Sequence, residues 1–233
     1  MRVLYGAPAS VFVRKVAILL EEKGVGFVVD PVNPMLETSA EFKSISPLGK
    51  IPVFRDGDFT VADSSAICSY IEAKYPAPPF YPKTAEELAK ALWYEEFADT
   101  ALFQAIAPCY YQAVLVPLYR NRVPDEQSIQ RALMQQLPPV ADYLERQLID
   151  KRHLVGHEFS IADVAVVSIF LNMHAAGFSL PEGKWPWLSS YLKLHFQRPS
   201  VLFCTQDLHK EVQRAEARKA QGFADSQLVS PAQ

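Results

Sequence analysis

The stretch from Ser46 to Ile67 constrains the fold of this chain more than any other. Leu48-Gly49 gives a turn, and Ile51-Pro52 follows it directly before a strand-like run. An X-Pro bond loses most of the preference for the trans form, and a proline between a turn and a strand is a favourable position for a cis bond. We therefore predict a cis peptide bond here, with the backbone N–H and C=O of Ile51 outside the sheet and free to pair with a peptide-like ligand.

A hairpin and a helix start follow the proline. Strand-like runs flank Asp56-Gly57, and Asp-Gly is the turn signal of a tight β-hairpin. Asp63-Ser64 then precede apolar residues at helical spacing, which predicts a helix N-terminus. The free N–H groups and positive dipole end of a helix attract a carboxylate, while the Asp63 side chain attracts an ammonium group. The α-amino acid end of a ligand carries both charges.

These two motifs resemble the glutathione site of the cytosolic glutathione S-transferases. S-P-L-G-K-I-P holds the residue before a cis-proline, and D-S-S-A-I holds an acidic residue and a serine at a helix start. The resemblance implies that Ile51 pairs with the cysteinyl backbone of glutathione, and that Asp63 and Ser64 bind its γ-glutamyl end. In the alternative interpretation, Pro52 merely shapes a loop and Asp63 merely caps a helix.

Residues 1–76 are predicted to form an α/β domain. Arg2–Tyr5 and Phe27–Asp30 are short strands, and apolar residues from Val11 to Lys23 recur at helical spacing. A strand-helix-strand unit of this size makes a parallel pair with a right-handed crossover. The complete order, βαβ-ββα, resembles a thioredoxin-like domain. No C-x-x-C motif opens the first helix, so dithiol exchange is excluded.

Ser10 stands where the first helix is expected to begin. Its place four residues before Arg14 resembles that of the catalytic serine in serine-type, bacterial-like glutathione transferases. The resemblance implies a hydroxyl donor that, with the positive helix end, stabilises the glutathione thiolate. A hydrogen bond to a charged acceptor contributes about 1.5–3 kcal/mol, or roughly one to two pKa units. Ser10 as a simple N-cap is one alternative. Tyr5 as the catalytic residue is another, although its apolar strand favours a core position.

The glycine carboxylate of glutathione needs a cationic partner, which related enzymes often supply as a lysine or histidine after the second strand. The aligned position here is Thr38, so that match fails. Lys50, beside Ile51-Pro52, is the predicted substitute. A lysine that points into water is the alternative interpretation.

After a proline-rich linker at residues 77–84, the pattern predicts an all-helical domain over residues 85–210. Pro108 and Pro117 are expected to kink or break one helical segment, and Pro138-Pro139 to interrupt a helix over residues 125–148. Residues 211–233 turn polar, which predicts a solvated or loosely docked tail. One buried helical face is expected to contain Leu88, Leu92, Trp93, Phe97 and Ala101.

A second motif lies in the helical half. Ser160 and Asp163 form a capping-box-like pair before a helix that is apolar nearly all round. The pattern resembles the folding motif of the transferase C-terminal domain, which implies a structural role for Asp163. The fold class is therefore α/β plus all-α, with a thioredoxin-like domain followed by a helical bundle. A lone His174 on the central helix is expected in the core.

The helical half is also expected to bind the second substrate. Phe103, Tyr110, Tyr111 and Val114 are predicted to line a pocket for an apolar electrophile, although an aromatic stripe is more commonly core. Asp99 is predicted to reach the glutathione ammonium group across a dimer interface, and an ordinary hydrogen-bonded helix residue is the alternative.

Composition narrows the function classes. Of 233 residues, 49% are hydrophobic and 21% charged, and the net charge of −3 argues against a nucleic-acid surface. Three scattered cysteines and five histidines have no metal-ligand spacing, so no metal is expected. No segment is expected to span a membrane, and a cytoplasmic location is predicted.

Together these features predict a glutathione S-transferase that conjugates glutathione to apolar electrophiles. Glutathione is then a co-substrate, no cofactor is tightly bound, and a two-fold homodimer is the expected assembly. A non-catalytic binding or assembly module of the same fold stays open. So does a glutathione-dependent isomerase, dehalogenase or peroxide reductase.

Overall fold

The computed structural model describes residues 1–7, 9–36 and 39–223. The N-terminal domain holds four short strands, β1 (Arg2–Tyr5), β2 (Val28–Asp30), β3 (Val53–Asp56) and β4 (Phe59–Ala62). Three helices accompany them, α1 (Val11–Glu22), α2 (Ala40–Ile45) and α3 (Ser64–Lys74). The order confirms the predicted βαβ-ββα arrangement, with the short helix α2 in the connection.

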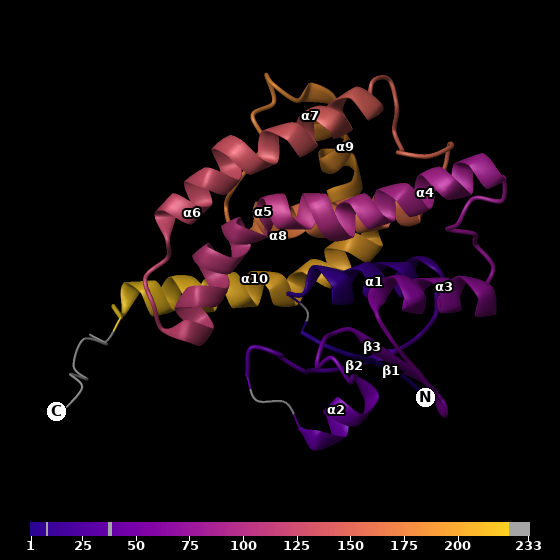
Figure 1. The fold of residues 1–233 in the computed structure, drawn as a ribbon, viewed down its shortest axis with the longest axis horizontal. Coiled ribbons are helices and arrows are strands. Elements are labelled where there is room, and N and C mark those ends of the chain that lie inside the picture. Colours follow the sequence, from indigo (N-terminus) through magenta and orange to yellow (C-terminus); the bar gives the residue numbers. More distant parts are fainter. Residues whose placement is uncertain (8, 37–38, 224–233) are drawn as a thin grey trace.

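The sheet is mixed and runs in the order β2-β1-β3-β4 (Figure 1). Strands β1 and β2 are parallel, as a crossover through α1 requires, and the other neighbours are antiparallel. Alternate residues face opposite sides of a strand, so Leu4 and Phe54 pack in the large core beside α1 and α3. Val3, Tyr5 and Val53 pack on the other face, against Phe42 of α2.

The register of the sheet places three loops together. Tyr5, the last residue of β1, lies opposite Val53, the first of β3, and Val53 lies opposite Ala62, the last of β4. The loop to α1, the Ile51-Pro52 segment and the start of α3 therefore leave the sheet at the same end. This arrangement brings the sequence-predicted ligand groups to one place.

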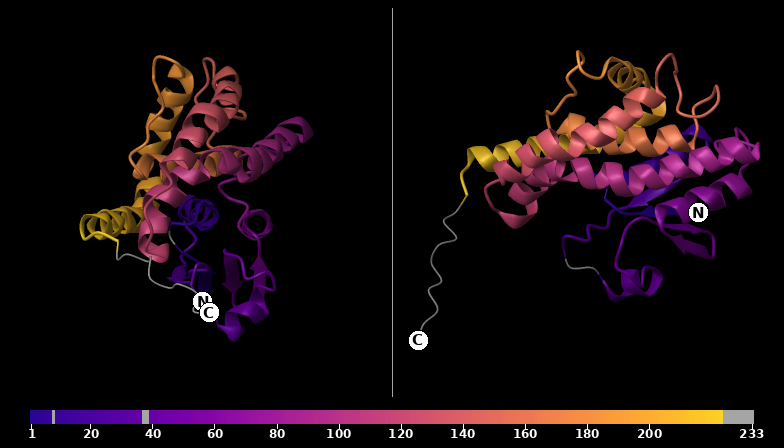
Figure 2. Two further views of the ribbon diagram at one scale, coloured as in Figure 1. Left: turned by 60° about the vertical axis from the view of Figure 1, so that its left-hand side comes forward. Right: turned by 45° about the horizontal axis from the view of Figure 1, so that its top comes forward.

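The second domain is entirely helical in its described residues. Figures 1 and 2 show it covering α1 and α3 on the side away from α2. Helix α8 is buried almost all round, as expected for the centre of this domain. The elements are α4 (Ala85–Phe97), η1 (Ala98–Leu102), α5 (Phe103–Tyr110), η2 (Tyr111–Arg120), α6 (Glu126–Arg131), η3 (Ala132–Gln136), α7 (Leu137–Gln147), α8 (Ile161–Ala175), α9 (Pro186–Phe196) and α10 (Pro199–Ala220), where η marks a π-helical segment.

The prolines do not break these helices. Pro108 lies inside α5 and Pro117 inside η2, within one continuous helical run from Ala85 to Arg120. Similarly, η3 ends just before Pro138-Pro139, which occupy the first turn of α7. The wider register of a π-helix accommodates a missing proline N–H, so the predicted interruptions become changes of helix type.

The run Ala85–Arg120 is also long and apolar enough, by length and composition, to cross a membrane. The prediction that no segment has this property is therefore wrong. Half of its most apolar window is buried inside the protein. A core helix of a helical domain meets the same criterion.

The buried face of α4 differs from the predicted one. Leu92 and Trp93 are exposed, while Tyr94 and Glu95 face the interior. The prediction counted the largest apolar side chains, but the contacts of α4 with α8 and the pairing of Glu95 with Lys15 of α1 select a different stripe. His174, expected in the core, is likewise exposed, and its ring packs on Phe196 at a centroid distance of 5.2 Å.

The predicted tail from residue 211 is wrong in its first part. Helix α10 continues to Ala220, and Ala215 is buried. Glu211 accepts hydrogen bonds from Tyr110 Oη at 3.1 Å and Tyr119 Oη at 2.8 Å, which attach the polar end of α10 to the rest of the domain. The part of this prediction that concerns residues 224–233 lies outside the described residues.

Candidate active site

The loop between β1 and α1 places Ser10 at the helix start. Its side chain accepts a hydrogen bond from Val13 N at 3.4 Å, so the predicted N-cap is confirmed. Gly6, with φ at +155°, allows the loop to pass close to α1, because a Cβ there would lie 2.3 Å from a methyl carbon of Val13. Ser10 is partly exposed at this end of the helix, so its hydroxyl can also meet a ligand.

The Ile51-Pro52 peptide bond is cis, as predicted. The preceding turn is held by Gly49 N, which donates to Ser46 O at 2.8 Å, and by Ser46 Oγ, which donates to Lys50 O at 2.7 Å. Among the described residues, no hydrogen bond engages the backbone of Ile51. Its N–H and C=O therefore have the pairing capacity that a peptide ligand needs.

Asp63 caps α3 from an unusual backbone conformation. Its φ is +77°, in a region that costs an L-residue energy and that clusters at functional sites. The carboxylate accepts from Ser65 N at 3.0 Å and Ala66 N at 3.2 Å, and the side chain remains exposed. Ser64, in contrast, is buried. The predicted cap is confirmed, and the exposed carboxylate is also available to an ammonium group.

A buried ionic network supports this helix start from behind. Lys15, on α1, is 1% exposed and donates to Ser65 Oγ at 3.0 Å, to Glu95 Oε1 at 3.1 Å and to Asp99 Oδ2 at 2.5 Å. Burial opposes the charge on Lys15, but nearby Cys68, Glu95 and Asp99 raise its pKa above the ordinary value. The network ties α1 and α3 to α4 and η1, and no pattern of neighbouring residues indicates it, because Lys15 lies far from its partners along the chain.

Asp99 pairs within its own chain. Its carboxylate pairs with Lys15 and accepts from Ser65 Oγ at 3.2 Å. Burial raises its pKa, while Lys15 acts in the opposite direction. Because this pair is close and charge-assisted, we assign it as an ion pair. The expected contact with glutathione across a dimer interface stays a prediction.

Lys50 is the predicted partner of the glycine carboxylate, in place of the failed match at Thr38. Lys50 is exposed, and its only hydrogen bond among the described residues is through its backbone oxygen. Thr38 lies outside the described residues. The role of Lys50 stays a prediction.

A cavity of about 360 Å³ opens beside the start of α1 and contains most of the predicted substrate residues. Phe103, Tyr110 and Tyr111 line it together with Val11. Val114, the fourth predicted residue, is buried and does not line this cavity, because its side of the helix faces the core. The Tyr110 hydroxyl donates to Glu211, so Tyr110 contributes its ring to the wall of the cavity.

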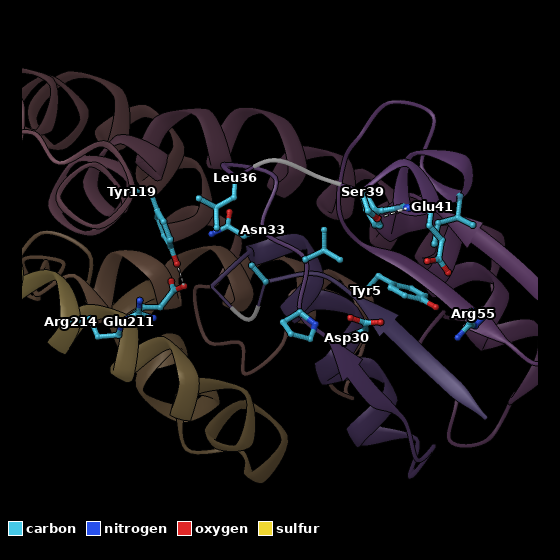
Figure 3. A pocket seen from close by; sticks show the side chains of 15 residues that line it. Tyr5, Asp30, Asn33, Leu36, Ser39, Glu41, Arg55, Tyr119, Glu211 and Arg214 are labelled. Atoms are coloured by element: carbon cyan, nitrogen blue, oxygen red, sulfur yellow. Dashed lines mark hydrogen bonds between the residues drawn. The ribbon is translucent and has the colours of Figure 1, made fainter.

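A larger cavity of about 780 Å³ lies between the two domains and was not anticipated from the sequence (Figure 3). Its N-terminal wall comes from β1, β3 and the segment around α2, and includes Tyr5 and Arg55. Its other wall comes from η2 and α10, including Glu211 and Arg214. The lining mixes charged side chains with apolar ones such as Leu36 and Phe42. Tyr5 is buried, as predicted, and Arg55 lies over its ring at 5.3 Å.

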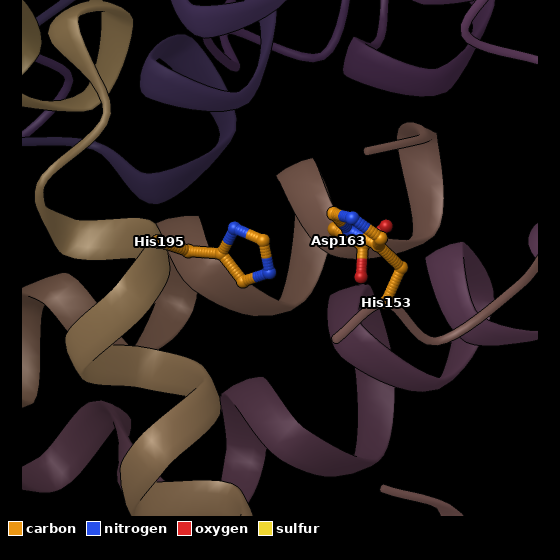
Figure 4. A group of neighbouring side chains, drawn as sticks. All are labelled: His153, Asp163 and His195. Atoms are coloured by element: carbon orange, nitrogen blue, oxygen red, sulfur yellow. The ribbon is translucent and has the colours of Figure 1, made fainter. Parts of the chain in front are cut away.

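His153, Asp163 and His195 lie together between the linker after α7 and helices α8 and α9 (Figure 4). Their ligand-type atoms are within 4.8 Å of one another, a grouping that sequence spacing did not reveal. Asp163 Oδ1 accepts from Leu154 N and Tyr191 Oη, and Oδ2 accepts from N and Oγ of Ser160. A carboxylate has about four acceptor positions, and all four are used. The cluster is therefore a hydrogen-bonding centre that carries the predicted capping box.

Burial shifts the pKa values of Asp163 and His195 in opposite directions. It raises the pKa of Asp163 to about 6, against the effect of its hydrogen bonds. It lowers the pKa of His195 to about 4, and Arg152 O, at 2.8 Å from Nε2, acts in the other direction. The imidazole of His195 is accordingly neutral near pH 7.

Comparison with known proteins identifies the family. The model of the glutathione S-transferase N-terminal domain matches residues 4–79, and that of the C-terminal domain matches residues 106–199. Glutathione S-transferase 3 of Zea mays is 35% identical over 167 residues, which cover 69% of this chain and 72% of the relative. The chain belongs to the glutathione S-transferase family. A Triticum aestivum glutathione S-transferase is 32% identical over 201 residues, covering 82% and 89%.

The solved structures agree with this assignment. The crystal structure of a glutathione S-transferase from Rhodospirillum rubrum F11 superposes with a TM-score of 0.80 at 25% identity, covering 88% of this chain and 92% of that one. The family assignment confirms the predicted fold class and the prediction of a glutathione transferase. The residues that carry the reaction are argued below from this chain's own geometry.

Proposed function

We propose that this glutathione transferase activates glutathione through Ser10 and conjugates it to apolar electrophiles, as a serine-type, bacterial-like member of the family. The observation that carries the proposal is that three loops leave the sheet at the same end. This arrangement brings the N-cap hydroxyl of Ser10, the unpaired backbone of Ile51 and the exposed carboxylate of Asp63 to one end of the sheet. These groups match a thiol, a peptide unit and an ammonium group in one ligand.

The reaction follows from this placement. Glutathione binds with its cysteinyl backbone on Ile51 and its γ-glutamyl end at Asp63 and Ser64. The Ser10 hydroxyl then donates to the sulfur, and the positive end of α1 adds to the stabilisation of the thiolate. The thiolate attacks the electrophilic carbon of a compound held in the cavity lined by Phe103 and Tyr111, and the leaving group departs with the bond electrons. Holding both reactants side by side provides the proximity.

Calorimetric titration of glutathione into the wild type and Ser10→Ala, with thiolate absorbance followed against pH, tests this proposal. We expect the wild type to lower the pKa of the bound thiol and Ser10→Ala to raise it again by roughly one to two units. Binding with the same thiol pKa in both proteins would remove Ser10 from the mechanism. Binding that Ser10→Ala leaves unchanged, without turnover of any electrophile, would favour a non-catalytic binding module.

The proposal includes a two-fold homodimer in the cytoplasm that uses glutathione as co-substrate without a tightly bound cofactor. Exposed apolar side chains on α4 (Leu92 and Trp93) and on β4 (Phe59) offer surface that a second copy would cover. Sedimentation equilibrium of the wild type and Trp93→Glu tests the assembly. A monomeric wild type would contradict it.

A further inference from the structure

Two side chains of the helical domain donate hydrogen bonds to the backbone on both sides of Ser10. Ser168 Oγ donates to Val11 O at 2.6 Å, and Asn172 Nδ2 donates to Ala9 O at 3.0 Å. Ser168 and Asn172 are four residues apart on α8, so they lie on one face of that helix, one turn from each other. Their acceptors are the carbonyl groups of the residues immediately before and after Ser10.

We propose that Ser168 and Asn172 are positioning residues for the thiol-activating hydroxyl of Ser10, so that the helical domain sets the activity of the glutathione site. The inference rests on the proposed function of Ser10. Through these bonds neither residue reaches the sulfur of glutathione. Each acts by fixing a peptide group that flanks the serine, and thereby the direction in which its Oγ points. Asn172 also lines the cavity proposed for the electrophile, so for its variant the thiol pKa is the deciding readout.

The surroundings make this contact rigid. Ala9, Val11 and Ser168 are all buried, so water cannot replace a lost bond easily. Arg14, also buried, donates from Nη1 to Ser168 O at 3.0 Å, which adds a bond in the reverse direction between the same two helices. The start of α1 is thus held to α8 by three hydrogen bonds, two that end on the carbonyls flanking Ser10 and one that Arg14 donates to Ser168 O.

Precise placement matters because Ser10 has two partners. Its oxygen already accepts from Val13 N at a long 3.4 Å, and its proton is the group available to a sulfur. A hydrogen bond to a charged acceptor is strong only when it is well aligned. Loosening the backbone around Ser10 would weaken that bond without removing the hydroxyl.

The test measures the thiol pKa of bound glutathione in Ser168→Ala, Asn172→Leu and the wild type. We expect each variant to raise this pKa by roughly half to one unit, a part of the one to two units expected from losing the whole bond. The drop in kcat/KM should be about three- to tenfold near pH 6.5 and should shrink above pH 9, where the thiol ionises without assistance. Ser189→Ala, which replaces another buried serine of the same domain, is the matched control and should leave the thiol pKa unchanged.

A double-mutant cycle separates positioning from general damage. In a Ser10→Ala background, Asn172→Leu should cause no further shift of the thiol pKa, because the hydroxyl that it positions is gone. A shift that persists in this background, or variants that lower the melting temperature with a wild-type thiol pKa, would overturn the inference. If Ser10→Ala itself leaves the pKa unchanged, or the wild type does not bind glutathione, the proposed function fails first and the inference fails with it.

Discussion

Replacing Lys15 by methionine should strongly destabilise this protein and weaken its glutathione site. Methionine keeps the length and apolar stem of the side chain but removes the charge. Glu95, whose side chain is 4% exposed, and Asp99, at 15%, would then face each other without a cation. Ser65, at the start of α3, would lose the same partner.

The expected cost follows from the burial of the pair. Removing one member of a buried ion pair destabilises by about 3–5 kcal/mol, because it leaves an uncompensated charge in the interior. For a chain of this size, such a loss lowers the melting temperature by roughly 10 °C. We also expect weaker glutathione binding, because the network anchors the α3 turn that presents Asp63.

Urea unfolding and calorimetric titration of glutathione measure these two effects. Lys193→Met is the matched control, since Lys193 and Glu182 form an ion pair that is 65% and 66% exposed and should contribute less than about 1 kcal/mol. The triple variant Lys15→Met/Glu95→Gln/Asp99→Asn should recover most of the lost stability. Equal costs for Lys15→Met and Lys193→Met would refute the reasoning, as would a triple variant no more stable than the single one.

Two further predictions concern the helical domain. Asp163→Ala should cost at least about 3 kcal/mol in urea unfolding, more than a lost cap alone, because four buried donors lose their acceptor; a cost near 1 kcal/mol would show that water replaces the carboxylate. His195→Gln should flatten the acid side of the stability profile. Because the folded pKa of His195 lies near 4, below the unfolded value near 6.5, the unfolded chain binds more protons in this window and stability falls as pH falls. As the pH falls from 7 to 4.5, the free energy of unfolding of the variant should rise by about 2 kcal/mol relative to that of the wild type. Stability profiles that run parallel over this range would contradict the lowered pKa of His195.

The local motifs of the site could be predicted from the sequence because each depends on neighbours along the chain. The Ile51-Pro52 bond, the Asp-Gly hairpin, the caps at Ser10 and Asp63 and the capping box at Ser160 all use residues within a few positions of one another. The parallel pairing of β1 and β2 could be predicted as well, because two strands joined by a helix of this size run parallel.

Predictions failed where tertiary contacts decide which of several similar residues is buried. The buried stripe of α4 was misplaced because its packing on α8 chooses which side of the helix is buried, and amphipathic spacing alone cannot tell a large exposed Trp93 from a buried Tyr94. The prolines of the helical domain were expected to kink or break helices, but the chain stays helical there and changes to π-helical segments, η2 around Pro117 and η3 before Pro138-Pro139. Helix α10 stays ordered past Lys210 because Tyr110 and Tyr119 meet Glu211 from a distant part of the chain.

The sequence by itself thus determined the main elements, their order and the chemical groups that we propose to bind glutathione. Only the tertiary structure decided what surrounds those groups: the ionic network of Lys15 behind α3, and the contacts of Ser168 and Asn172 with the peptides beside Ser10. These contacts join residues more than 40 positions apart, and their existence depends on how two domains pack. The pattern of neighbouring residues does not predict that packing, because the same apolar helix face can pack against many different partners.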